Sequence, residues 1–183
     1  MKTLRHHVLI FDQNCPLCNA YTGAFIKTRM LDERGREAYN EISETTCDLL
    51  DKNRARNEIA LVNTKTGQVV YGIDSLFRIL SNAFPVFAPL FGFKPFRWLM
   101  KKLYSFISYN RKVIIPSKPG QDYCVPDFNL KYRWAYLLFT WLSTSAILNL
   151  YSKQLEGVLP PSRFLREFLI CGGQIIFQAC TLY

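Results

Sequence analysis

The chain is organised around one short stretch, Val8-Leu9-Ile10-Phe11-Asp12-Gln13-Asn14-Cys15-Pro16-Leu17-Cys18. Four apolar residues open it, and their length and β-branched content predict a buried strand. Asp-Gln-Asn then breaks the apolar run, and two cysteines follow with two residues between them. The next residues, to about Leu31, have the apolar spacing of a helix. A strand, a loop and a helix that opens on Cys-x-x-Cys indicate a thioredoxin-like redox site.

This spacing suits thiol–disulfide exchange, which needs one thiolate that attacks and a second thiol that releases the mixed disulfide. The first sulfur lies at the helix N-terminus, where free amides and the helix dipole favour an anion. We therefore expect Cys15 to be the exposed thiolate that attacks and Cys18 the more buried thiol that resolves. Asp12 either accepts a proton from the pair or caps the helix, and the sequence leaves both roles open. The predicted catalytic residues are Cys15, Cys18 and Asp12.

Other uses of a Cys-x-x-Cys pair are less consistent with this chain. A structural zinc site would need two further ligands, but the only histidines, His6 and His7, precede the first strand, and no second Cys-x-x-Cys is present. Two unreactive cysteines in a helix remain an alternative. We expect no metal and no bound cofactor. Cys47, Cys171 and Cys180 are expected to be small apolar residues, whereas Cys124 could relay electrons or face a partner.

The amino-acid composition excludes several classes of protein. The 183 residues are 49% hydrophobic and 20% charged, which excludes a disordered chain. The net charge of +9 is spread along the sequence without a nucleic-acid-binding motif, so we expect no nucleic-acid partner. Six scattered cysteines do not form a secreted disulfide scaffold. The first apolar run is too short for a signal peptide, which favours a cytoplasmic N-terminal part.

The following segments complete an α/β core over about residues 6–82. Alternating strand and helix patterns give the order β-α-β-α-β-β-α, with Gly67 in the hairpin turn between the last two strands. This is the minimal order of a thioredoxin-like fold. The predicted elements after the first helix are Ala38–Ile42 (strand), Cys47–Arg56 (helix), Glu58–Asn63 (strand), Gln68–Gly72 (strand) and Ile73–Asn82 (helix).

Beyond this core we expect a helical extension over residues 83–115, so that the thioredoxin-like domain covers residues 1–115. Three prolines exclude one continuous helix over Ala83–Met100, whereas Trp98–Asn110 has an amphipathic pattern. Residues 116–133, which include a proline-rich loop, are predicted to be a linker. Residues 134–183 form the last predicted segment, which is apolar and helical.

This apolar segment predicts one or two transmembrane helices. Trp134–Tyr151 holds no charged residue. Its 18 residues are at the lower limit of the length that spans a ~30 Å hydrocarbon core. Phe164–Tyr183 is a weaker candidate. Positive charge before Trp134 exceeds that between the two candidates, which predicts a membrane protein with a cytoplasmic N-terminal domain. The chain ends within an apolar stretch, so it is either a fragment or has a last helix that finishes in the membrane.

Three segments resemble a known family. Phe11-Asp12-x-x-Cys15-Pro16-Leu17-Cys18 is similar to the signature of the DCC family of predicted thiol–disulfide oxidoreductases, in the thioredoxin-like superfamily. Two further segments, Tyr71–Leu80 and Tyr104–Arg111, are similar to the family's glycine–Asp helix start and to its tyrosine-to-Asn-Arg segment. The resemblance covers about residues 6–115. It implies a thioredoxin-like fold, Cys15 and Cys18 as the redox pair, and no agreed substrate.

Two positions depart from the expected patterns. Gln13 stands where the family usually has glycine, and no proline precedes Ile59, where thioredoxins carry a cis-proline that faces the active site. The second departure argues against thioredoxin-style peptide recognition. We expect a thiol–disulfide oxidoreductase at the cytoplasmic membrane face, whose partner is a protein or small-molecule thiol or disulfide. The alternatives are a membrane-anchored binding or assembly module without catalysis, and a protein that carries metal on the Cys-x-x-Cys pair.

Overall fold

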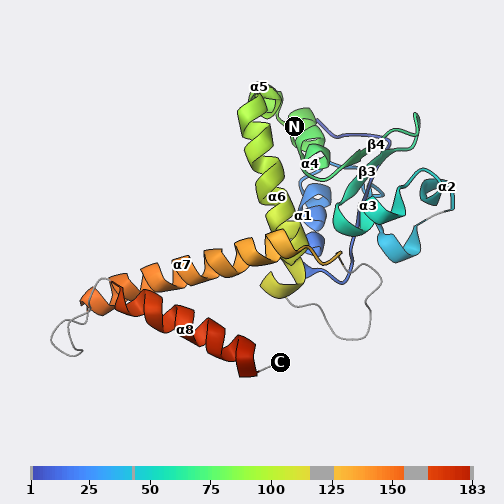
Figure 1. Ribbon diagram of the computed structural model, residues 1–183. Helices are drawn as coiled ribbons and strands as arrows, with labels where there is room; N and C mark the ends of the chain where they lie inside the picture. The colour runs from blue at the N-terminus through green and yellow to red at the C-terminus, as the bar shows by residue number, and fades with distance from the viewer. Residues whose placement is uncertain (1, 43, 116–125, 155–164, 182–183) are drawn as a thin grey trace. The chain divides into compact units, whose positions relative to one another are not determined.

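The computed structural model describes residues 2–42, 44–115, 126–154 and 165–181 (Figure 1). The chain divides into two compact units, Met1–Asn129 and Leu130–Tyr183, and each is described by itself. Part of the predicted linker, residues 116–125 with Cys124, lies outside the described residues.

The first unit contains one four-stranded mixed sheet. The strands lie in the order β2-β1-β3-β4, so the strand that leads to the cysteines is central (Figure 1). β1 runs parallel to β2 and antiparallel to β3, and β3 runs antiparallel to β4. The strands are β1 (His7–Phe11), β2 (Arg36–Ala38), β3 (Ala60–Asn63) and β4 (Val69–Tyr71).

Helices alternate with these strands in the predicted order. Two differences are local. The strand predicted at Ala38–Ile42 is misplaced, because β2 shares only Ala38 with it and a 3₁₀ turn follows. The predicted helix at Cys47–Arg56 is two short helices. The second of these begins where the Asp51 carboxylate caps the amides of Asn53 and Arg54. The helices are α1 (Pro16–Lys27), α2 (Glu44–Cys47), α3 (Lys52–Asn57), α4 (Ile73–Ala83), α5 (Ala88–Gly92) and α6 (Lys94–Ile114), with 3₁₀ turns η1 (Tyr39–Glu41) and η2 (Pro85–Phe87).

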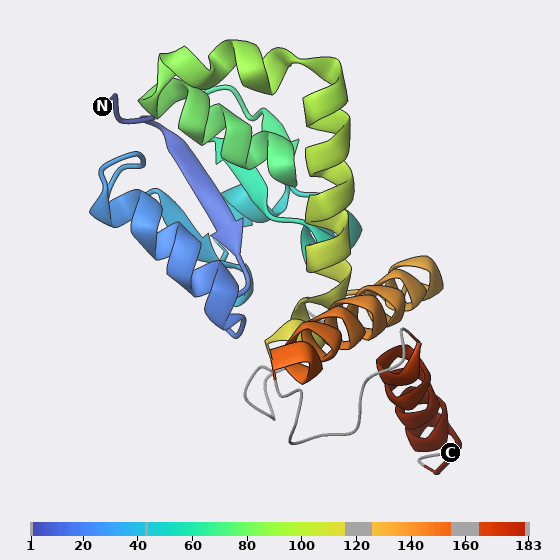
Figure 2. The same ribbon diagram turned by 90° about the vertical axis from the view of Figure 1, so that its left-hand side faces the viewer.

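The sheet separates two apolar layers, because successive side chains of a strand point to opposite faces. Leu9 and Leu61 face one layer with Ile79 of α4, and Tyr21 of α1 and Tyr104 of α6 pack against it. Residues of β1 and β3 one position further along face the other layer, against α3. Figures 1 and 2 show α1, α4 and α6 on one side of the sheet and α3 on the other. The second group comprises Ile10, Ala60, Val62, Leu50 and Ala55.

Helix α6 is longer than the predicted Trp98–Asn110 helix. Pro95 lies in its first turn, where a missing backbone N–H costs nothing. The Asp74 carboxylate, in the first turn of α4, pairs with Arg97 at 2.8 Å and with Lys101 at 2.9 Å. These ion pairs join α6 to α4 at the surface, and further along α6 the Arg111 side chain pairs with Asp12, beside the cysteine motif.

The second unit consists of α7 (Leu130–Gln154) and α8 (Arg166–Thr181), which pack against each other. The indole Nε1 of Trp141 donates a hydrogen bond to the Phe168 carbonyl at 2.9 Å. A Cβ added at Gly172 would lie 3.1 Å from the same indole nitrogen, so the glycine allows the close approach of the two helices.

The predicted transmembrane helices are wrong, because none of the described helices is long and apolar enough to cross a membrane. α7 has sufficient length, but its uncharged stretch holds five polar residues, which lower its hydropathy. α8 has 16 residues, or about 24 Å at 1.5 Å per residue, which is less than a ~30 Å hydrocarbon core. The predicted membrane location, with the N-terminal domain on the cytoplasmic side, is overturned with them. The five residues are Thr140, Ser143, Thr144, Ser145 and Asn149.

Candidate active site

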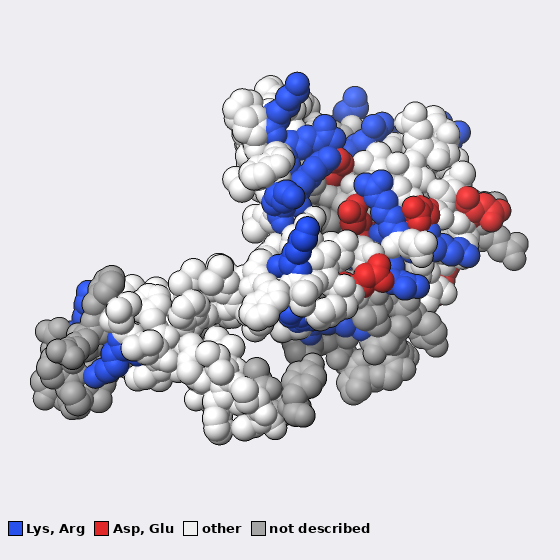
Figure 3. Space-filling view, in the orientation of Figure 1, with Lys and Arg blue, Asp and Glu red and all other residues white. Residues whose placement is uncertain are grey.

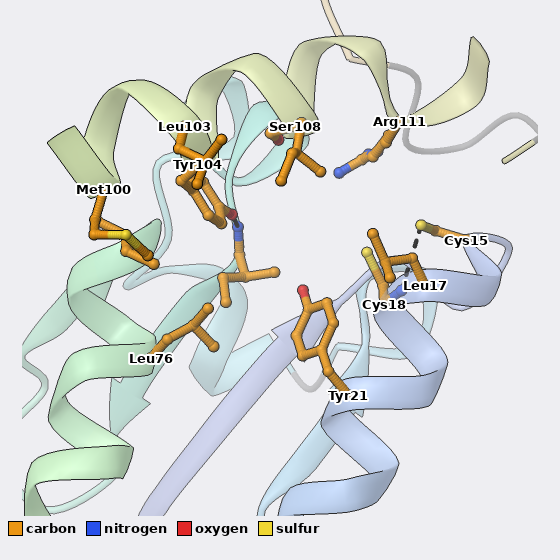
Figure 4. A pocket seen from close by; sticks show the side chains of 13 residues that line it. Cys15, Leu17, Cys18, Tyr21, Leu76, Met100, Leu103, Tyr104, Ser108 and Arg111 are labelled. Carbon is orange, nitrogen blue, oxygen red and sulfur yellow. Dashed lines mark hydrogen bonds between the residues drawn. The ribbon is translucent and has the colours of Figure 1, made fainter. Parts of the chain in front are cut away.

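The cysteine pair lies where β1 passes into α1. Both cysteines are 5% exposed, so the predicted exposure of Cys15 relative to Cys18 is wrong. Cys15 is the N-cap residue of α1, and its Sγ accepts a hydrogen bond from the Cys18 backbone N–H at 3.4 Å (Figure 4). Pro16 follows in the first turn, where a residue without an N–H is tolerated. The sulfur therefore takes the place that a serine or aspartate oxygen takes in other helices, facing amides that favour an anion.

The surroundings of Cys15 stabilise its thiolate. The Cys18 side chain, the Cys18 amide and the Arg111 cation each lower the pKa of Cys15. Burial and the Asp12 charge raise it by less, so the pKa falls from 9.0 to about 6. Because its pKa lies below neutral pH, Cys15 is mostly a thiolate at pH 7. A thiolate is the form of cysteine that attacks a disulfide.

The pKa of Cys18 is shifted in the opposite direction. The Cys15 sulfur, burial and the negative charge of Cys15 raise the pKa of Cys18 far above its ordinary value, although Arg111 and the Tyr21 hydroxyl act against this rise. Burial also raises the pKa of Tyr21, so its hydroxyl keeps its proton beside Cys18. The two cysteines therefore differ in protonation at neutral pH, with a thiolate at position 15 and a thiol at position 18.

Asp12 is buried in the loop before α1. One carboxylate oxygen, Oδ1, accepts the Asn14 amide at 3.0 Å, and the other, Oδ2, lies 3.1 Å from Arg111 Nη2. The cap of α1 is Cys15, so the structure places Asp12 in an ion pair and a loop turn instead of the capping role left open by the sequence. Both side chains of the ion pair are 6% exposed.

Arg111 belongs to this site, although its sequence position alone did not predict a role there. It comes from α6, and its Nη2 also donates to the Arg56 carbonyl at 3.2 Å. A signal was present in the sequence, because Tyr104, Ser108 and Arg111 follow at i, i+4 and i+7 and so share one face of a helix. Polar side chains with this spacing in an otherwise apolar face indicate buried partners.

These three side chains hold the loop that precedes β3. The Ile59 N–H donates to the Tyr104 hydroxyl at 3.0 Å, and the Ser108 hydroxyl donates to the Asn57 carbonyl. No described peptide bond is cis. In place of the cis-proline loop of thioredoxins, this chain has a trans loop whose backbone groups are bound by α6.

A cavity of about 210 Å³ lies beside the cysteine pair. Figure 4 shows Cys15, Cys18 and Arg111 at one end and Met100 at the other, with Tyr21 and Tyr104 extending into it from α1 and α6. The other described residues that line it are mainly aliphatic, and none of them is acidic. The arrangement joins a reactive thiolate to an apolar space.

Comparison with known proteins agrees with this chemistry. The family model for DCC1-like thiol-disulfide oxidoreductases matches residues 9–115, which is more than half of the chain. The chain belongs to the DCC1-like thiol-disulfide oxidoreductase family. The resemblance predicted from the sequence is thus confirmed. No curated protein and no solved structure matches the chain.

The DCC1-like match covers every site residue described above, from Asp12 to Arg111. Gln13, which departs from the family pattern, accepts a hydrogen bond on its backbone carbonyl from Asn19 Nδ2 at 2.7 Å, and this bond ties the loop to α1. Among the residues that the structure describes, no group of three or more His, Cys, Asp or Glu side chains is arranged to hold a metal ion.

Proposed function

We propose that this protein exchanges disulfides through Cys15 and Cys18, with Cys15 as the attacking thiolate and Cys18 as the resolving thiol. Membership of a thiol-disulfide oxidoreductase family supports the reaction class. The observation that carries the assignment is the opposed protonation of the two cysteines, with the pKa of Cys15 at about 6 and that of Cys18 raised.

The reaction is a transfer of two electrons from the dithiol to a substrate disulfide. The Cys15 thiolate attacks one substrate sulfur, the substrate S–S bond breaks, and the leaving thiolate takes a proton. Cys18 then loses its proton and attacks the Cys15 sulfur. The second substrate thiol leaves and the protein holds a Cys15–Cys18 disulfide. The same steps in reverse oxidise a substrate dithiol.

Two charged residues have supporting roles in this proposal. The Arg111 cation stabilises the Cys15 thiolate before attack. Asp12 assists proton transfer when Cys18 becomes the nucleophile. Two observations support this role of Asp12. It is buried in the loop that leads to the cysteine pair, and its charge acts on Cys15.

Alkylation of the reduced protein with iodoacetamide between pH 5 and pH 9 tests the assignment. Peptide mass spectrometry should show that Cys15 reacts with a midpoint near pH 6, as its pKa of about 6 requires. Cys47, a partly exposed free cysteine of the same chain, is the internal control. If Cys15 reacts no faster than Cys47 at neutral pH, the proposal fails.

A trapping experiment tests the order of the two steps. The Cys18→Ser variant keeps the attacking thiol but cannot resolve, so it should accumulate a mixed disulfide on Cys15 with a small disulfide. The Cys15→Ser variant should form little adduct at pH 7, because burial, which also raises the pKa of Cys18, remains when the Cys15 sulfur is removed. Equal adduct formation in both variants would contradict the assigned roles.

A further inference from the structure

We propose that the cavity beside the cysteine pair binds a small disulfide with apolar substituents, or the thiols that it yields. This inference rests on the proposed function, because it needs Cys15 to react with disulfides. It goes further by naming the substrate class and the site that selects it.

The first step concerns the loop before β3. Peptides that add to a sheet or loop as a strand need free backbone N–H and C=O groups on the protein. In this loop the Arg56 carbonyl, the Asn57 carbonyl and the Ile59 N–H already bind side chains of α6. A peptide backbone at this position would have to take the Ile59 N–H from Tyr104 and displace the α6 side chains that lie against the two carbonyls. The usual way of holding an extended peptide opposite Cys15 is therefore closed.

The second step concerns access to the thiols. Cys15 and Cys18 are each 5% exposed, and both line the cavity. A disulfide on the surface of a large folded protein does not reach sulfurs at this depth without a rearrangement. A small molecule whose substituent enters the cavity brings its sulfur to Cys15 directly.

The third step concerns the chemistry of the lining. Aliphatic side chains such as Leu17, Leu76 and Leu103 dominate it, and the Arg111 cation is paired with Asp12. An apolar substituent gains by leaving water for this lining. A hydroxyl or charged substituent loses its hydrogen bonds to water and finds few partners here, which costs binding energy.

The fourth step concerns size. A cavity of about 210 Å³ offers room for a small apolar group beside the cysteine pair. This space accommodates short alkyl substituents on either side of a disulfide.

The test uses three disulfides and the full-length reduced protein. Dipropyl disulfide and bis(2-hydroxyethyl) disulfide have the same size and differ only in that a methyl replaces a hydroxyl at each end; oxidised glutathione is the peptide-like comparison. Rates of loss of the Cys15 thiol are divided by the rates of the same disulfides with a free small thiol, which removes intrinsic reactivity. We expect dipropyl disulfide to react at least about tenfold faster than each of the others. Equal rates, or a faster rate with glutathione, would overturn the inference.

A pair of variants on α6 locates the preference. Leu103 lines the cavity and is 47% exposed, so Leu103→Trp should fold and narrow the space. We expect it to remove most of the preference for dipropyl disulfide. Leu99→Trp, 57% exposed on the same helix and outside the lining, should leave the preference intact. An unchanged preference in Leu103→Trp would contradict the cavity as the site. If no disulfide reacts with Cys15 at all, the proposed function fails; if all react without preference, only this inference fails.

Discussion

Two charged side chains act on the Cys15 sulfur in opposite directions. Beyond the contacts with Cys18 and the effect of burial, Arg111 lowers the pKa of Cys15 and Asp12 raises it. We predict that Arg111→Met moves the alkylation midpoint of Cys15 above pH 6, and that Asp12→Asn moves it below. Iodoacetamide rates at Cys15 across pH measure both shifts. Shifts of the same sign in the two variants would refute this account of the site.

The ion pair between Asp12 and Arg111 also affects the stability of the fold. Because both side chains are 6% exposed, Arg111→Met leaves a buried carboxylate without its cation. Breaking a buried pair in this way costs about 3–5 kcal/mol of unfolding free energy. The double variant Asp12→Asn/Arg111→Met removes both charges and should recover part of the loss in urea denaturation. An additive loss in the double variant would show that the two side chains do not act as a pair.

The lowered pKa of Cys15 also predicts how the stability of the reduced protein depends on pH. A group whose pKa falls on folding contributes stability above its unfolded pKa and loses it as the pH falls through its folded pKa. For Cys15 these values are 9.0 and about 6, so stability should rise from pH 6 to pH 9. The gain is at most about 4 kcal/mol, at 1.36 kcal/mol per pKa unit.

Urea denaturation of the reduced protein at several pH values measures this rise. Other groups titrate in the same window, so the Cys15→Ser variant under identical conditions is the reference. We expect the difference between the two proteins to grow with pH up to about 9, the unfolded value. A difference that stays constant over this range would contradict the lowered pKa in the folded state.

The residues of the site differ in how far the sequence could predict them. Cys15 at the helix N-terminus follows from local rules, because a strand, a loop and Cys-Pro at a helix start lie within a few residues. The partnership of Asp12 with Arg111 does not, because it depends on where α6 packs. The i, i+4, i+7 spacing of Tyr104, Ser108 and Arg111 indicated a shared face, but not the loop that this face would hold.

At the scale of elements, α6 fixes the loop before β3 through single hydrogen bonds that substitution can remove one at a time. Tyr104→Phe keeps the ring and deletes the hydroxyl that accepts the Ile59 N–H at 3.0 Å. A buried amide left without its acceptor costs about 1–3 kcal/mol, and we predict a loss of this size in unfolding free energy.

Tyr151→Phe is the matched control for this substitution. Tyr151 is 59% exposed on α7, so loss of its hydroxyl should change stability by less than about 0.5 kcal/mol. Urea denaturation of both variants gives the comparison. Equal small effects would mean that the Tyr104 hydroxyl does not hold the loop in solution.

The elements themselves were predictable where the pattern was local and strong. β1, β3 and α4 begin and end within about two residues of the predicted bounds, because short continuous apolar runs define the strands and an amphipathic pattern defines the helix. β2 was misplaced because three residues carry little pattern and their strand character comes from pairing with β1. α7 has no charged residue over Trp134–Tyr151, but its hydroxyl and amide side chains make the stretch too polar to cross a membrane.

At the scale of the whole molecule, the candidate active site and the family match both lie in the first unit. The family match ends at residue 115, within Met1–Asn129. Figure 3 shows Lys and Arg side chains over much of the visible face of this unit, with acidic side chains among them, whereas the visible described atoms of the second unit are mostly uncharged. The two units therefore differ in surface character as well as in secondary structure.

This division predicts that the thiol chemistry survives removal of the second unit. Every group that shifts the pKa of Cys15, namely Cys18, Arg111 and Asp12, lies before Asn129. A chain that stops at Asn129 should therefore fold and alkylate at Cys15 with the same midpoint near pH 6 as the full chain. Circular dichroism establishes folding, and mass spectrometry of both chains gives the two midpoints. A midpoint that moves toward pH 9 in a folded truncated chain would mean that residues 130–183 help to set the reactivity of the pair, which the contacts within the first unit do not require.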